Sequence, residues 1–305
     1  MRLSIIIATR NRAHTIAPCL DSIAAACANA GLADAEIVVV DNGSTDDTRE
    51  AIARWKTAHS TAVQALSEPQ AGKSRALNRA IRAARGELLA FTDDDCRFQR
   101  DYVSTLLRYD AGDSDLVLRG GRVELGDPAD MPVCILTSTE KARWTLADDS
   151  ARSIHFAGKV YGCNMTMRRA LIDRVGLFDA KLGPGTAIPA ADDTDFMYRA
   201  YLAGVAVEYV PDMVVFHHHG RNTAAAARAV LTNYFIGDGA LFAKYILKHP
   251  SFCRVNYWYL KKALREMRGG ANTFHPEIGL SYRDYTAWSL RGALRYSSGV
   301  LGGMR

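Results

Sequence analysis

ELLAFTDDDC, residues 87–96, is the stretch from which the fold of this chain can be read. Residues 88–91 form a continuous apolar run, which is typical of a strand covered on both faces in a parallel sheet. The acids that follow, Asp93, Asp94 and Asp95, are then expected at the strand's carboxyl end, where open α/β sheets bind ligands. Three adjacent carboxylates repel one another unless a cation or protonation offsets the charge, so a divalent metal holding a phosphate is the economical interpretation. A turn with a helix N-cap is the plainer alternative, but it needs only one Asp.

Composition places the chain among ordinary globular proteins. Its 305 residues, 48% apolar and 23% charged, suit one large domain, alone or with an appendage. No basic, hydrophobic leader precedes the strand that begins at Leu3, and no apolar run approaches the roughly 20 residues that span a bilayer. We therefore expect a cytoplasmic protein without an integral membrane segment. The six cysteines lack close paired spacing, which predicts neither a zinc knuckle nor a disulfide framework.

Strand and helix patterns alternate along the first 96 residues, which predicts a parallel, doubly wound sheet with right-handed crossovers. Residues 8–12, ATRNR, lack the Gly-rich fingerprint of a nicotinamide-binding sheet, and Ser67 stands where a P-loop ending at Gly72 would require glycine. The expected strands are 3–8, 36–41, 63–67 and 87–91, then 115–124 with a bulge at its glycines, 161–167 and 213–216. The expected helices are 15–29, 47–58, 74–84, 169–176 and 189–203, followed by a helical tail over 231–305.

Five motifs, in order, carry a resemblance to a known family. They are IIIATRNR at 5–12, VVVDNGSTDDT at 38–48, AGKSRALNRAI at 71–81, FTDDDC at 91–96 and ADDTDF at 191–196. Together they resemble the family 2 glycosyltransferases, inverting enzymes with the GT-A fold. The resemblance implies an α/β fold with a Rossmann-like, mostly parallel sheet and helices on both faces. It also implies a catalytic domain at 1–220, with a nucleotide-binding half at 1–98 and an acceptor-binding half at 99–220, followed by a helical, basic C-terminal extension at 221–305.

The resemblance implies a nucleotide site on the first half of the sheet. Thr9, Arg12 and Asp41 would hold the base and the ribose, since a carboxylate accepts hydrogen bonds from a base N–H or a ribose hydroxyl. Arg75 and Asn78 would lie near the nucleotide or its phosphates. A helix-loop cap for Asp41 and a solvated helix face for Arg75 and Asn78 are the structural alternatives.

The acids after the apolar run fall on the family's D-x-D signature. Alternate residues of an extended segment share a side, so Asp93 is expected at the ribose and Asp95 at the metal-diphosphate, with Asp94 between them. Hard oxygen ligands and phosphate suit Mg²⁺ or Mn²⁺, and no thiolate cluster is expected to compete.

A run of three histidines follows the strand expected at 213–216. Alternation places His217 and His219 on one side and directs His218 away. The resemblance implies that a histidine from this place reaches the diphosphate and the metal, so His217 and His219 are candidate ligands. A plain surface or phosphate contact is the alternative.

Asp192, Asp193 and Asp195 open an expected helix, where the dipole favours negative charge by about 0.3 to 1 kcal/mol each. The resemblance implies that the second member of the acidic pair, Asp193, is the catalytic base, although Asp192 replaces a more usual Glu. A general base must lie within about 3 Å of the acceptor hydroxyl, so only one acid of the pair can act. The sequence leaves open whether it is Asp192 or Asp193. Gly162 and Asn164 are candidates for the floor of the sugar pocket, with a satisfied core Asn as the alternative.

Charge is divided unevenly along the chain. From His217 onward, 13 Lys and Arg stand against 4 Asp and Glu, an excess of +9 in a chain whose net charge is +5. This helical tail interleaves basic and aromatic residues, which suits peripheral docking on an anionic membrane at the inner face of the plasma membrane; a helical cap with a solvated basic face is the alternative. Nucleic acid is not an expected partner, since no known module motif is present.

The expected activity is inverting transfer of a sugar from a nucleoside-diphosphate sugar to a hydroxyl of a saccharide or lipid-linked acceptor, as in bacterial surface-polysaccharide or lipopolysaccharide synthesis. Mn²⁺ or Mg²⁺ would stabilise the departing diphosphate. A sugar-phosphate nucleotidyltransferase is the alternative enzyme, but residues 9–12 lack the glycine-rich loop that it needs. A non-catalytic nucleotide-sugar-binding protein is the other alternative, and it would not need Asp193.

Overall fold

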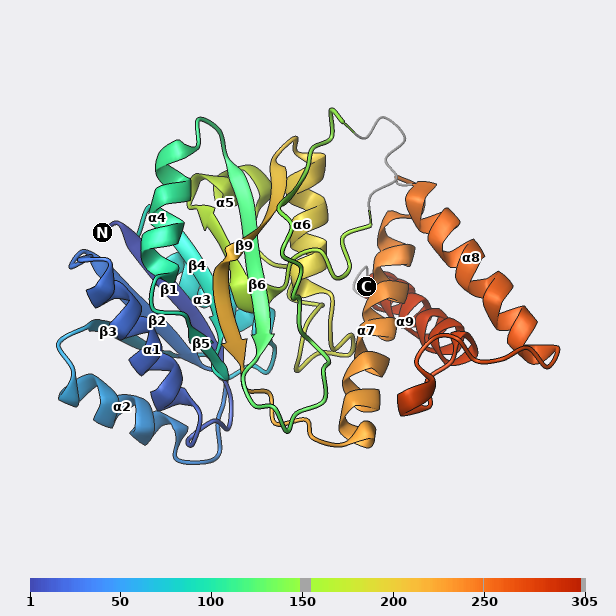
Figure 1. The fold of residues 1–305 in the computed structure, drawn as a ribbon, viewed down its shortest axis with the longest axis horizontal. Helices are drawn as coiled ribbons and strands as arrows, with labels where there is room; N and C mark the ends of the chain where they lie inside the picture. The colour runs from blue at the N-terminus through green and yellow to red at the C-terminus, as the bar shows by residue number, and fades with distance from the viewer. Residues whose placement is uncertain (149–154, 249, 303–305) are drawn as a thin grey trace.

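A nine-stranded sheet forms the centre of the computed structural model, which describes residues 1–148, 155–248 and 250–302 (Figure 1). Neighbouring strands follow the order β3-β2-β1-β4-β8-β6-β9-β5, and β7 pairs with β9. The strands are β1 Leu3–Thr9, β2 Ala35–Asp41, β3 Ala62–Ser67, β4 Leu88–Asp93, β5 Cys96–Phe98, β6 Val117–Leu125, β7 Ala142–Trp144, β8 Met165–Arg168 and β9 Ala206–His217.

The first four strands form the predicted parallel half of the sheet. β1 pairs in parallel with β2 and β4, and β2 pairs in parallel with β3. Alternate side chains of β1 enter two different cores: Leu3, Ile5 and Ile7 lie in one, and Ile6 lies in the other. Because both faces are buried, the apolar runs are continuous rather than alternating.

Helices cover both faces of the sheet, as predicted. Side chains of α1, α2 and α4 join the core on one face, and those of α3, α5, α6 and α7 join the core on the other. These helices are α1 Ile16–Asn29, α2 Thr48–Ala58, α3 Lys73–Ala83, α4 Tyr102–Gly112, α5 Ala170–Val175, α6 Asp192–Leu202 and α7 Ala224–Tyr245.

The second half of the sheet differs in detail from the prediction. The predicted bulge in β6 is confirmed, because its register against β9 shifts between Gly121 and Arg122. A Cβ at Gly121 would lie 2.0 Å from Met213 O, so only glycine fits this close approach. The strand expected at 161–167 begins instead with a short 3₁₀ turn, η1 Gly162–Asn164, and β9 is much longer than expected because it pairs along the whole of β6.

Three long helices end the chain, and the first of them is part of the main core. Ile236, Ala240 and Leu241 of α7 pack with residues of the sheet and α6. The other two, α8 Pro250–Met267 and α9 Tyr282–Gly302, lie beyond α7 on the side away from the sheet, with the turn η2 Pro276–Ile278 between them (Figure 1). Within the described residues, none of the helices is long and apolar enough to cross a membrane. The domain boundary at 220/221 stays a prediction.

Candidate active site

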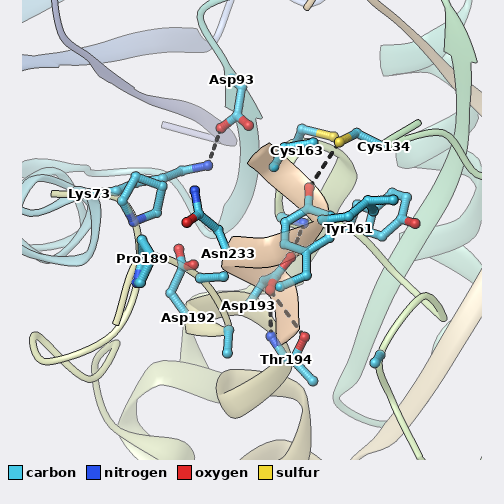
Figure 2. Close-up of a pocket in the computed structure, with 18 of the residues that line it drawn as sticks. Lys73, Asp93, Cys134, Tyr161, Cys163, Pro189, Asp192, Asp193, Thr194 and Asn233 are labelled. Carbon is cyan, nitrogen blue, oxygen red and sulfur yellow. Dashed lines mark hydrogen bonds and ion pairs between the residues drawn. The ribbon is translucent and has the colours of Figure 1, made fainter. Parts of the chain in front are cut away.

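A cavity of about 730 Å³ lies at the carboxyl ends of β1 and β4. The sheet contributes Thr9 and the three acids at the end of β4, Asp93 to Asp95, and the N-terminus of α6 contributes Asp192 and Asp193. Figure 2 shows Asp192 and Asp193 around this space with Lys73 and, from α7, Asn233. The D-x-D segment and the acidic pair, which are far apart in the sequence, therefore line one cavity.

The three acids do not lie on an extended segment. β4 ends at Asp93, and Asp94 and Asp95 form a turn before β5. Asp93 pairs with Lys73 Nζ (Figure 2), whereas Asp94 Oδ1 lies 3.2 Å from Arg12 Nε and Asp95 Oδ2 lies 3.4 Å from Arg12 Nη2. The alternation expected of an extended strand does not apply here, because the chain turns at this point.

Asp95 and His217 form a buried pair on the cavity wall. Asp95 Oδ1 lies 3.2 Å from His217 Nε2, and His217 Nδ1 lies 3.2 Å from Cys134 O. Burial acts to lower the pKa of His217, but the hydrogen bond to Asp95 raises it to about 9. Burial acts to raise the pKa of Asp95, but the hydrogen bond and the charge of His217, together with the charge of Arg12, hold the pKa of Asp95 below its usual range. The imidazole is therefore protonated at neutral pH when no cation is bound.

The chemistry of this donor set fits a hard divalent cation. Asp95 offers carboxylate oxygens, which suit Mn²⁺ and Mg²⁺, and His217 adds one imidazole nitrogen, a borderline ligand that favours Mn²⁺ over the harder Mg²⁺. Beside them, burial and the charge of Asp95 raise the pKa of Asp94 to about 6. A bound cation would displace the proton from His217 and reduce the repulsion among the acids, so the residues fit the predicted metal.

His219 does not line the cavity. Its ring lies edge-on behind that of His217, with the centroids 5.1 Å apart, and its Nδ1 accepts the N–H of Arg221 at 3.0 Å. Asp130 Oδ2 lies 3.4 Å from the same nitrogen. The two histidines share a side as alternation predicts, but of the two only His217 lies beside Asp95.

Two thiols lie beside His217, although no thiolate cluster is expected from the sequence. Cys96, Cys163 and His217 are buried, and one potential ligand atom from each lies within 4.8 Å of the others. Burial raises the pKa of Cys96 well above its usual range, so the thiol is protonated when no metal is bound. Zinc-type sites bind thiolates, so a soft metal here would have to displace that proton. The fold brings together cysteines that are far apart in the sequence.

The three acids of α6 have different surroundings. Asp193 Oδ2 accepts the N–H of Gly162 at 2.8 Å, and its Oδ1 accepts the N–H of Thr194 at 2.7 Å (Figure 2). Burial, followed by the charge of Asp193, raises the pKa of Asp192, while Lys73 acts to lower it. Both Asp192 and Asp193 line the cavity.

Asp195 is turned into the protein and does not line the cavity. Its Oδ1 accepts the hydroxyl of Tyr245 at 2.7 Å and lies 2.7 Å from Lys244 Nζ, and its Oδ2 accepts Arg199 Nε at 2.9 Å. Tyr245 and Lys244 belong to α7, so the third acid of the motif ties α7 to α6.

Of the seven residues expected at the nucleotide, four line the cavity, namely Thr9, Arg12, Asp93 and Asp94. Asp41 lies at the neighbouring strand end, where it accepts the N–H of Ser44 at 3.0 Å and pairs with Arg49. Arg75 is absent from the cavity wall.

Asn78 is a structural residue in this fold. It is buried, its amide nitrogen donates to Phe178 O, and its amide oxygen accepts the N–H of Phe178, both at 2.9 Å. These bonds tie α3 to the loop before α6, so the expected nucleotide contact is corrected.

Gly162 and Asn164 have separate roles. Gly162 lines the cavity beside Asp193. Asn164 is fully buried, accepts the hydroxyl of Tyr102 at 2.8 Å and donates to Arg122 O and Met213 O, each at 2.9 Å. The core alternative therefore applies to Asn164.

Several cavity residues escape the sequence analysis. Lys73 stands in the AGKSRALNRAI motif, in which Arg75 and Asn78, but not Lys73, are expected near the nucleotide. Arg221 follows the histidines, and Asn233 and Asp238 lie on α7, in a tail whose composition indicates only a basic helical segment. The sequence could not show that these α7 residues lie near the acids, because that depends on how α7 packs.

The chain is similar to known proteins in sequence and in fold. The sequence profile described as Glycosyl transferase family 2 matches residues 4–175, more than half of the chain. EpsH of Bacillus subtilis (strain 168) is 24% identical over 278 residues, which cover 84% of this chain and 77% of EpsH.

Two solved structures share the fold. The mannosyltransferase PcManGT from Pyrobaculum calidifontis, in complex with GDP-Man and Mn²⁺, has a TM-score of 0.65 at 23% identity, covering 97% of this chain and 86% of its own. Residues 1–349 of S. aureus TarS, in complex with UDP-GlcNAc, have a TM-score of 0.57 at 20% identity, covering 88% of this chain and 78% of theirs. The GT-A fold expected from the sequence is confirmed.

Proposed function

Because the chain belongs to glycosyl transferase family 2, we propose that this glycosyltransferase moves a sugar, with inversion, from a nucleoside-diphosphate donor to a hydroxyl of a saccharide or lipid-linked acceptor. The observation that carries the proposal is that one cavity holds both the acids at 93–95 and the acidic pair at 192–193. The family assignment sets aside the nucleotidyltransferase and the non-catalytic alternatives. Relatives of this fold hold GDP-Man with Mn²⁺ and UDP-GlcNAc, which supports the donor class but neither base nor sugar.

Four basic residues on the cavity wall support binding of a diphosphate. They are Arg10, Arg12, Lys73 and Arg221. Burial acts to lower the pKa of Lys73, but Asp93 and Asp192 raise it above its ordinary value, so the ammonium stays charged. Within the described residues, Arg221 Nη1 is buried and has no hydrogen-bond partner, so a phosphate oxygen would satisfy it. Mn²⁺ or Mg²⁺, held by Asp95 and His217, would supply Lewis-acid stabilisation of the leaving diphosphate.

We assign the general base to Asp193. The N–H groups of Gly162 and Thr194 and the hydroxyl of Thr194 fix its carboxylate, and Oδ2, which accepts only the Gly162 N–H among the described residues, keeps a lone pair that can take the proton of an acceptor hydroxyl. The deprotonated oxygen then attacks the anomeric carbon as the bond to the diphosphate breaks. Asp192 is the competing base, because its raised pKa favours proton uptake near neutral pH.

The test compares Asp193→Asn with Asp192→Asn against a panel of UDP- and GDP-sugars. General-base assistance is worth roughly 10²- to 10⁴-fold, so we expect Asp193→Asn to lose turnover by at least 100-fold. Donor binding, read from the rise in melting temperature, should remain in both variants. An Asp193→Asn variant that keeps its activity while Asp192→Asn is inactive would reassign the base. If the native chain releases no nucleoside diphosphate from any of these donors, the transferase proposal is rejected.

The exposed surface of α8 supports the further proposal of peripheral membrane docking. An apolar stripe with i, i+3, i+7 and i+10 spacing is exposed to solvent, namely Tyr257, Leu260, Leu264 and Met267. Basic side chains flank it, and those exposed are Arg254, Lys261, Lys262, Arg265 and Arg268. Apolar insertion combined with attraction to anionic headgroups is the usual physics of interfacial helices, and it would bring the cavity to a lipid-linked acceptor at the cytoplasmic face.

A further inference from the structure

The cavity has an arm that the proposed chemistry does not use. Its wall is formed by helices α7, α8 and α9 and by the segment between α8 and α9. The residues that line it are Leu231, Phe235 and Asp238 of α7, Tyr259 of α8, Phe274 just before η2, and Tyr285 of α9. These elements lie on the side of α7 away from the sheet (Figure 1). The same cavity contains Asp193, so a ligand in this arm has access to the reacting end.

Aromatic rings form most of this wall. The ring of Tyr285 lies 4.3 Å from that of Tyr259 and 5.0 Å from that of Phe235, centroid to centroid, and Phe274 lies 5.6 Å from Phe235. They belong to a hydrophobic cluster that is separate from the two cores of the sheet. Mutual packing holds the rings in place, so the wall is preformed rather than assembled around a ligand.

One carboxylate lies among these rings. Asp238 Oδ2 accepts the hydroxyl of Tyr285 at 3.3 Å, a long bond, and no ion pair joins Asp238 to any Lys, Arg or His of the described residues. The acids at 93–95 differ, since each lies beside Lys73 or Arg12. Burial raises the pKa of Asp238 to about 7, which reflects how poorly its charge is compensated.

Asp238 is half-buried and its side chain lines the cavity, so a carboxylate that lacks a cation here is stabilised when a ligand supplies hydrogen-bond donors. With a pKa of about 7, Asp238 accepts hydrogen bonds as a carboxylate and can donate one when protonated, so hydroxyl groups, which both donate and accept, are its fitting partners. Aromatic faces favour a ligand that is apolar on one face and polar at its rim. A lipid chain would leave Asp238 unpaired, and a phosphate would be repelled by it.

We infer that this arm is an acceptor subsite for a saccharide ring, with Asp238 accepting hydrogen bonds from ring hydroxyls and the aromatic side chains covering the ring's less polar face. The inference rests on the proposed function, which it deepens by placing the sugar of the acceptor against α7, α8 and α9. A lipid attached to that sugar would lie outside the arm. Asp238 then selects and positions the acceptor, while Asp193 takes the proton.

The test measures binding of methyl glycosides of glucose, galactose, mannose and N-acetylglucosamine to the full chain by saturation-transfer NMR, with UDP or GDP and Mn²⁺ present. The informative variants are Asp238→Leu, which cannot accept a hydrogen bond, and Tyr285→Phe, which keeps the ring. The matched control is Asp173→Asn, an exposed acid on α5. Melting temperature and nucleotide binding confirm that each variant is folded.

We expect at least one glycoside to bind the native chain and the control equally. Binding should weaken at least tenfold in Asp238→Leu and by a smaller factor in Tyr285→Phe, with nucleotide binding unchanged in both. Unweakened glycoside binding in Asp238→Leu, or no glycoside binding to a native chain that binds nucleotide, would overturn the subsite. Glycoside binding through Asp238 in a chain that neither binds nucleotides nor cleaves donors would keep the subsite and reject the transferase proposal.

Discussion

Gly239→Ala should destabilise this protein, because α7 and α9 approach closely where glycines leave room for the opposite backbone. A Cβ at Gly239 would lie 1.7 Å from Ser289 O, and one at Gly292 would lie 1.9 Å from Ile236 O. Ordinary van der Waals contact begins at 3.4 Å. To accommodate the added methyl group, α9 would have to retreat by about 1.7 Å in a packed interior.

The expected magnitude follows from two opposing effects. Overpacking costs about 1 to 3 kcal/mol, and the upper end applies here because the obstacle is a helix carbonyl rather than a flexible side chain. Alanine is the better helix former by about 1 kcal/mol, which offsets part of that cost. The net loss in the free energy of unfolding is therefore about 2 kcal/mol.

Urea denaturation followed by circular dichroism measures this change as a lower midpoint at similar slope. The matched control is Gly299→Ala on α9, because a Cβ there meets no heavy atom within 4 Å, and it should gain up to about 1 kcal/mol from helix propensity. The close crossing would be refuted if Gly239→Ala were as stable as the native chain, or more stable, in the same experiment in which Gly299→Ala is stabilised.

The same substitution has a functional readout. Asp238 precedes Gly239 on α7, and Tyr285 lies one turn before Ser289 on α9. Retreat of α9 would break the 3.3 Å bond between Tyr285 and Asp238. Glycoside binding should therefore weaken in Gly239→Ala while nucleotide binding, which depends on the opposite end of the cavity, stays unchanged.

Three further predictions concern the metal, acid stability and the membrane. Asp95→Asn should abolish the Mn²⁺-dependent part of nucleotide binding in thermal-shift assays, and undiminished metal dependence would contradict the assignment. Burial acts to raise the pKa of Glu36, but hydrogen bonds from Ser4 and Arg85 lower it to about 2. The stability that this lowered pKa contributes is present above about pH 4.5 and is lost as the pH falls towards 2. Glu36→Gln should therefore lower the free energy of unfolding by about 3 kcal/mol at pH 7, and by progressively less in urea denaturation experiments between pH 5 and pH 3. A loss that does not change with pH would contradict this origin. The chain should co-sediment with anionic but not neutral vesicles at low salt, and it should do so less once the basic residues that flank the α8 stripe are changed to Gln. Sedimentation that these changes leave unaltered would mean that the basic face is part of a helical cap and not a membrane-docking surface.

The parallel half of the sheet could be predicted from the sequence because its signals are local. Residues 88–91 are continuously apolar since both faces of β4 are covered, and glycines and polar turns separate the strands from the helices that follow them. A parallel sheet directs the carboxyl ends of neighbouring strands to one edge, so the place of Asp93 beside the end of β1 follows from the same pattern.

The partners of the site residues were decided by the tertiary structure alone. Whether Asp193 faces the cavity and Asp195 faces α7 depends on how α7 packs on α6, and the pairing of Asp238 with Tyr285 joins residues 47 positions apart. Hydrophobic periodicity records which face of each element is buried but not which distant element covers it. Local patterns therefore determined the strands and the helices of the sheet half, whereas the packing of α7 and α9 determined which polar side chains share the cavity.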